Sequence, residues 1–149
     1  MEFLRKQKAG FLAYVIVAVM TMITLTIYVS NVSAAYYKDM NTRVVFMMVC
    51  ALVLIATTVV LPQLSNGKLV TIIVDIFRVA AAVLIIMSGV TFIGMRVESF
   101  GYIFGSNLEL GNEAAFHAGS QAITGIILFV VTWLLSLVAA FLQVGKKEK

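Results

Sequence analysis

Two residues of opposite charge, Asp75 and Arg78, lie three positions apart in the otherwise apolar run 69–98. On a helix this spacing places both side chains on one face, where they can pair. Because an isolated charge in hydrocarbon is costly, the pair predicts a polar contact with another helix or an intramembrane proton or solute step. The alternative is that the pair lies at the edge of the membrane and not within the hydrocarbon. Residues 79–95 alone form about 25 Å of uncharged helix, which would leave the pair at the cytoplasmic interface with Arg78 snorkelling.

A second group of charges, Arg96 and Glu98, closes the far end of the same run. Like the first pair, these residues are candidates for a polar contact within the membrane or with a partner protein, because ionisable groups beside a span need a counter-charge or water.

Three further residues with metal-binding chemistry, Glu109, Glu113 and His117, recur every four positions in the connection 96–121. On a helix they would share one face, and two carboxylates with an imidazole suit a divalent metal. Gly111 weakens such a helix, however, and the spacing drifts around the axis. We therefore expect a solvated polar face, with no metal or other cofactor and no catalytic residue, and a metal or catalytic site is the alternative.

The same connection is too apolar for an ordinary solvated loop. Phe100, Tyr102 and Phe104 alternate with other residues along it. Bulky aromatic side chains beside a span are typical of the lipid interface or of a contact with a partner protein. We expect one of these environments for the connection, which we predict to be partly helical.

The elements that must position these residues are membrane spans. Hydrophobic residues make up 62% of the 149 and charged residues 12%, against about 25% charged in a soluble domain. The net charge of +4 lies at segment ends, which argues against nucleic-acid binding. The single cysteine, Cys50, permits no intrachain disulfide.

The sequence predicts one all-α domain, 1–149: an antiparallel bundle of four transmembrane helices at about 11–29, 44–61, 69–95 and 122–144. Pro62 should end the second span, since proline cannot continue the hydrogen-bond ladder. The short segment 63–68 contains Asn-Gly, a turn signal, so the second and third spans should form a tight hairpin.

Counts of lysine and arginine predict the orientation. With both termini inside, seven basic residues lie inside and three outside, which favours N-in and C-in in the plasma membrane. The inner seven are Arg5, Lys6, Lys8, Lys68, Lys146, Lys147 and Lys149, and the outer three are Lys38, Arg43 and Arg96.

Residues 96–143, which include RVESFGYIFGSNLELGNEAAFHAGSQAITG and TWLLSLVAAFLQ, together with the start FLRKQKAGF, resemble a group of small four-span membrane proteins of Gram-positive gut bacteria. The resemblance covers most of the chain. It implies a bacterial cytoplasmic membrane and assigns no functional residue.

These features favour a non-enzymatic accessory or scaffold subunit of a larger membrane complex, such as a transporter, with lipid and other membrane subunits or a second copy as partners. The alternative is a small homo-oligomeric transporter or channel, with a polar path around Asp75 and Arg78. A third hypothesis is an enzyme that uses Glu109, Glu113 and His117.

Overall fold

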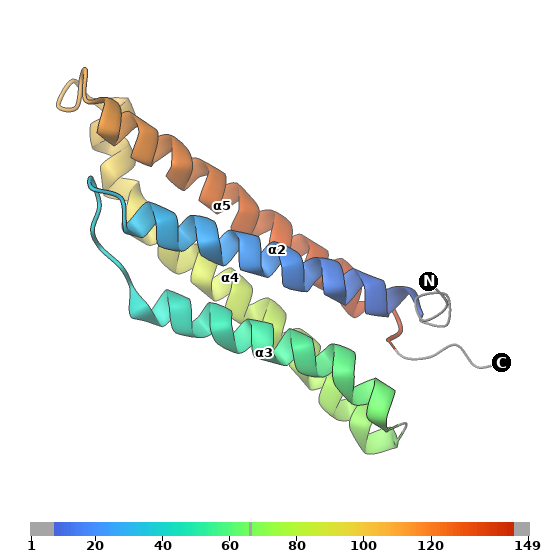
Figure 1. Cartoon of the computed structure of the whole chain (residues 1–149). Helices are drawn as coiled ribbons and strands as arrows, with labels where there is room; N and C mark the ends of the chain where they lie inside the picture. The colour runs from blue at the N-terminus through green and yellow to red at the C-terminus, as the bar shows by residue number, and fades with distance from the viewer. Residues whose placement is uncertain (1–7, 66, 145–149) are drawn as a thin grey trace.

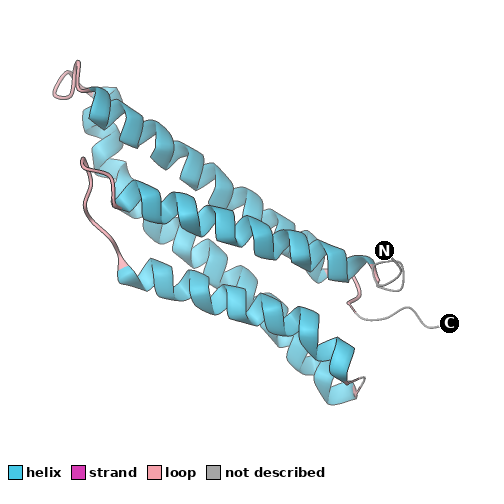
Figure 2. Ribbon diagram, in the orientation of Figure 1, coloured by secondary structure: helices cyan, strands magenta, loops and turns pink. Residues whose placement is uncertain are grey.

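The computed structural model describes residues 8–65 and 67–144, and these form four helices and no strand. The helices are α2 (Ala9–Val32), α3 (Thr42–Leu64), α4 (Lys68–Gly105) and α5 (Glu113–Ala140). Each is long and apolar enough to cross a membrane. The prediction of an all-α chain with four apolar helices is therefore confirmed (Figure 2).

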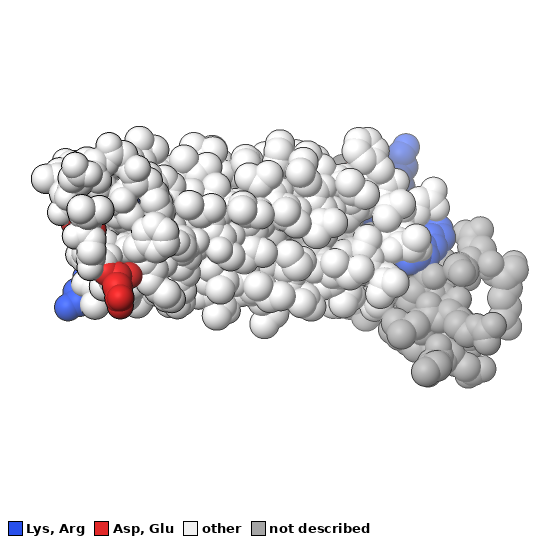
Figure 3. All heavy atoms as spheres, turned by 90° about the horizontal axis from the view of Figure 1, so that it is seen from above, with Lys and Arg blue, Asp and Glu red and all other residues white. Residues whose placement is uncertain are grey.

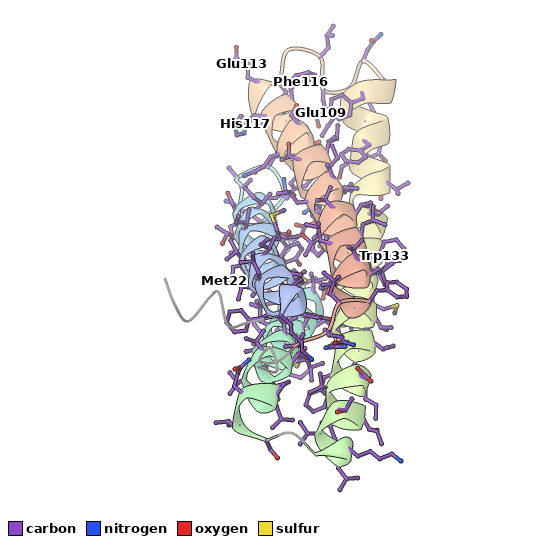
Figure 4. All side chains as sticks on the ribbon, turned by 90° about the vertical axis from the view of Figure 1, so that its right-hand side faces the viewer. Met22, Glu109, Glu113, Phe116, His117 and Trp133 are labelled. Carbon is purple, nitrogen blue, oxygen red and sulfur yellow. The ribbon has the colours of Figure 1, made fainter. Side chains whose placement is uncertain are left out.

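Figure 1 shows the chain reversing direction at each connection, so that the described part of the chain begins and ends at the same end of the molecule, the end with the termini. The most extensive contact is between α3 and α4, and α5 packs on both α2 and α4. The two hairpins are displaced along the long axis. At the end with the termini the α3–α4 hairpin extends beyond α2 and α5, while at the other end the α4–α5 hairpin extends beyond α2 and α3 (Figures 1 and 4).

Helix α4 belongs to both of the displaced hairpins and is continuous from one end of the molecule to the other. Its 38 residues correspond to about 57 Å of helix, nearly twice a hydrocarbon core of about 30 Å. Its first half packs on α3 and its last turns on α5 (Figure 1).

The side chains at the centre of the bundle are aromatic and small. The Tyr28 ring meets the Phe92 ring edge-on, with 5.2 Å between the ring centroids, and Phe129 lies 5.8 Å from Phe92. A Cβ at Gly125 would lie 3.0 Å from the Phe92 ring, and a Cβ at Gly89 would lie 3.1 Å from Phe129. These glycines let the rings reach the facing backbone, which is how helices associate where lipid removes the hydrophobic driving force.

Buried hydroxyl groups within the helices are largely satisfied by their own backbone. Thr21, Thr58 and Ser88 each donate to the carbonyl four residues earlier. Thr24 and Thr132 form a different contact, because their hydroxyl groups meet at 2.9 Å and join α2 to α5.

On the face of the molecule seen in Figure 3 the charged side chains lie at the two ends, and no charged side chain lies between them. Exposed large hydrophobic residues occur on all four helices, for example Met22, Val53, Val83 and Val130. This apolar band between charged ends is typical of a protein embedded in lipid.

The predicted end of the second span is wrong. Pro62 lies inside α3, which continues to Leu64, because proline removes only one backbone hydrogen bond and the Ser65 N–H still donates to the Leu61 carbonyl at 3.2 Å. The connection 96–121, predicted to be partly helical, is helical except for the link 106–112 between α4 and α5. The last helix ends at Ala140, and the turn signal at Asn66 lies outside the described residues.

Candidate functional site

The most polar position inside the bundle is Arg96, on the outward extension of α4. Its side chain is fully buried, with 0% of its surface exposed. Nη1 and Nη2 donate to the two carboxylate oxygens of Asp39 at 2.6 and 2.9 Å, and Asp39 lies in the link between α2 and α3. This two-point geometry is the strongest form of an Arg–carboxylate contact.

The rest of the guanidinium is also paired. Nε donates to Asn31 Oδ1 at 3.0 Å, and the Asn31 amide donates to the Ala118 carbonyl on α5 at 2.9 Å. The Tyr37 ring stacks on the guanidinium, with 3.6 Å between Cζ and the ring centroid. We call Arg96, Asp39, Asn31 and Tyr37 the arginine cluster. It ties α2, the first link, α4 and α5 together at one end of the bundle.

The electrostatic environment of the arginine cluster acts on its tyrosine. Burial raises the pKa of Tyr37, and the nearby Arg96 charge partly opposes that rise. The tyrosine therefore stays neutral at physiological pH. Because the Arg96 charge is paired within the chain, the arrangement is suited to holding the fold.

Arg96 and Glu98 are not brought together, in contrast to their grouping by sequence. Glu98 lies on the exposed side of α4, where it accepts from the Tyr102 hydroxyl at 2.9 Å. Sequence reasoning missed Asp39 and Asn31. The available signal was that Asp39 is the only acidic residue in the first link, on the same predicted side of the membrane as Arg96.

Asp75 and Arg78 do pair on one face of α4, with 3.0 Å between Asp75 Oδ1 and Arg78 Nη1. The two side chains differ in exposure, at 58% for Asp75 and 12% for Arg78. The Arg78 guanidinium turns inward, 5.6 Å from the Tyr14 ring on α2. Two buried donors there, Arg78 Nε and Tyr14 Oη, have no hydrogen-bond partner.

The predicted carboxylate and histidine group lies at the α4–α5 end. Glu113 and His117 share a face of α5, whereas Glu109 lies in the link and accepts from Tyr36 and Asn112 at 3.1 and 2.7 Å. Figure 4 shows these glutamates and His117 at the same end of the bundle. Among the described residues no three His, Cys, Asp or Glu side chains are close enough to hold a metal ion.

A pocket of about 610 Å³ lies at this end, between the last turn of α4, the link and the first turns of α5. Ten residues line it: Ile103, Ser106, Glu109, Leu110, Gly111, Asn112, Glu113, Phe116, His117 and Ser120. We call it the loop pocket. Sequence reasoning grouped three of these residues but did not predict the pocket, which depends on where the link folds.

The three aromatic residues predicted to face lipid or a partner behave differently from one another. Phe100 packs against the core, and Phe104 contacts Phe116 with 5.5 Å between ring centroids. A Cβ at Gly119 would lie 3.0 Å from the Phe104 ring, so Phe104 packs directly on the α5 backbone. Tyr102 and Phe104 are equally exposed, at 43% and 44%, but Tyr102 has no such contact with α5 among the ring contacts described. Part of the apolar character of this segment therefore belongs to the chain's own α4–α5 contact.

Together the fold and these sites define a helical protein with four candidate membrane spans, held at one end by a buried arginine cluster. No protein family, curated protein or solved structure matches the chain.

Proposed function

We propose that this chain is a multi-pass protein of the bacterial plasma membrane, folded as an antiparallel four-span bundle with both termini inside. The apolar band of Figure 3 supports the membrane location. The orientation rests on the basic residues counted from the sequence, since among the described ones Lys8 and Lys68 lie at the end with the termini and Lys38, Arg43 and Arg96 lie at the other. The remaining basic residues expected inside, Arg5, Lys6, Lys146, Lys147 and Lys149, lie outside the described residues.

Within that membrane we propose a non-enzymatic accessory or scaffold subunit of a larger complex, such as a transporter. One observation carries the proposal: Asp75 is 58% exposed on a helix whose neighbouring surface, including Ile72, Ile76 and Val79, is apolar and exposed. A carboxylate on such a face has one counter-ion, Arg78, which is turned toward Tyr14. A donor from a partner helix would complete its coordination.

The arginine cluster also supports the proposal, because its buried charge is paired inside the chain, in contrast to the exposed Asp75. Arg96 is the only fully buried charged residue among those described, and its guanidinium bonds to Asp39 and Asn31 within the chain. A charge used in this way stabilises a scaffold and leaves the outward-facing Asp75 as the polar group available to a partner.

The test is a mild-detergent purification of the tagged protein from native membranes, with mass spectrometry of what remains bound. We expect a stoichiometric partner with the wild type, its loss with Asp75→Asn, and its retention with Glu98→Gln. The latter removes an exposed carboxylate of the same helix at the other end. Wild-type protein that purifies alone, or a partner retained by Asp75→Asn, would contradict the proposal.

The alternative is a homo-oligomeric transporter or channel with its polar path around Asp75 and Arg78. Tyr28, Phe92 and Phe129 fill the centre of one chain, so such a path must lie between copies. The outward direction of Asp75 favours a contact of this kind. A single-species oligomer in the purification, with vesicle flux that falls in Asp75→Asn, would establish it.

A further inference from the structure

We propose that the loop pocket binds an organic cation with an apolar body, such as a quaternary or aromatic-substituted onium ion. Its volume, about 610 Å³, lies within the range of pockets that hold small organic molecules. The loop pocket lies at the opposite end of the bundle from Asp75. The proposal therefore does not depend on whether a protein partner binds at Asp75.

Contacts within the chain form one wall of the pocket without a ligand. Gly111 adopts φ +81°, which lets the link turn sharply into α5. The Asn112 side chain then caps α5 by accepting from the Ala115 N–H at 3.1 Å and donates to Glu109 at 2.7 Å. Tyr36 reaches across from the first link to bond the same carboxylate at 3.1 Å. These contacts fix the link that closes one side of the pocket.

The lining is mostly apolar and includes two carboxylates. Ile103, Leu110 and Phe116 supply hydrocarbon and one aromatic ring. Glu109 and Glu113 are the charged lining residues, and neither forms an ion pair within the described part of the chain. Glu109 has accepted two hydrogen bonds and, with four lone-pair sites on a carboxylate, still has capacity to accept.

This combination selects the charge and shape of the occupant. A cation gains from both carboxylates and from the face of an aromatic ring, whereas an anion of the same size would be repelled. The mostly apolar lining does not suit a bare, strongly hydrated metal ion, because such an ion needs several oxygen or nitrogen ligands.

Two ions of nearly identical size and shape but opposite charge test the proposal: tetraphenylphosphonium and tetraphenylborate. Binding of each to the full chain in nanodiscs of uncharged headgroup is measured by calorimetry, with empty nanodiscs subtracted. We expect saturable, one-to-one binding of the cation and none of the anion. Glu113→Gln should weaken the cation by about threefold, the effect of one solvent-exposed charge contact. Phe116→Ala should weaken it by about two- to fivefold through loss of the ring.

Glu98→Gln is the matched control, because it removes one negative charge at the same end of the molecule but outside the pocket. It should leave the affinity for the cation unchanged. Equal binding of the two ions would overturn the proposal and indicate an apolar occupant such as a lipid chain. Equal loss in Glu98→Gln and Glu113→Gln would overturn it in favour of general surface attraction, and absence of saturable cation binding would also refute it.

Discussion

The guanidinium of Arg96 and the carboxylate of Asp39 meet in a two-point ion pair at 2.6 and 2.9 Å, although 57 positions separate them in the chain. The arginine is completely buried and the aspartate is 39% exposed. This ion pair therefore holds the link between α2 and α3 against α4.

Asp39→Asn should destabilise the protein, because it leaves the Arg96 charge buried without its counter-ion. We expect a loss of about 2 kcal/mol in the free energy of unfolding, below the 3–5 kcal/mol typical of fully buried pairs because Asp39 is partly solvated. Chemical unfolding in detergent micelles measures it. Glu98→Gln, which removes only an exposed hydrogen bond to Tyr102, should change stability by about 0.5 kcal/mol or less. Equal losses of stability in Asp39→Asn and Glu98→Gln would show that the Arg96–Asp39 pair does not stabilise the fold more than a surface contact does.

Gly10→Ala should loosen the contact between the start of α2 and the end of α5. A Cβ at Gly10 would lie 2.5 Å from the backbone oxygen of Gln143, and backbone cannot move aside cheaply. We expect a cost of about 1–3 kcal/mol. Gly94→Ala is the matched control in α4, because nothing lies within 4 Å of its added Cβ. It should be neutral or stabilising by up to about 1 kcal/mol. Thermal unfolding of both variants measures these changes in stability. A Gly10→Ala variant as stable as the wild type would contradict the close approach of α2 to Gln143.

Thr24→Val should weaken the α2–α5 contact by removing one partner of the hydroxyl pair with Thr132. The expected cost is about 0.6 kcal/mol, the average for hydrogen bonds between membrane helices. Thr26→Val removes a hydroxyl that bonds only the Met22 carbonyl on its own helix, so it should cost less. If the two variants unfold alike, the interhelical bond contributes nothing measurable.

Tyr36 should titrate above its ordinary pKa of 10.0. Burial raises the pKa first, and the hydrogen bond to Glu109 raises it further. Because the folded-state pKa exceeds the unfolded one, this contribution to stability is complete below pH 10 and is lost as pH rises through the folded-state value. Carbon-13 NMR of labelled tyrosine rings, assigned with Tyr36→Phe, measures the pKa. In Glu109→Gln the pKa should fall, and an unchanged pKa would exclude the glutamate as a cause.

The four helices could be predicted because twenty or so consecutive apolar residues leave few alternatives. The end of α4 and the start of α5 could not be predicted from hydropathy, since both helices extend beyond the continuous apolar stretches. A helical signal was present: Phe100 and Phe104 are four apart, which places them on one helical face, and their rings lie 5.8 Å apart.

The arginine cluster shows why the candidate site was predicted only in part. Asp75 and Arg78 are close in sequence, so local geometry determines their pairing. Arg96, Asp39 and Asn31 come together only when α2 and α4 pack, and no spacing rule in one sequence specifies that contact. The same holds for Glu109, whose hydrogen bond to Tyr36 depends on the paths of two separate links.

The unbroken length of α4 has a mechanical consequence. Asp75 and Ile103 of the loop pocket lie on this one helix, about 42 Å apart at 1.5 Å per residue. Arg96 lies between them on the helix, much nearer the pocket than Asp75. The Asp75 face and the loop pocket therefore belong to one continuous element, which the arginine cluster ties to α2 and which α3 and α5 hold along its length.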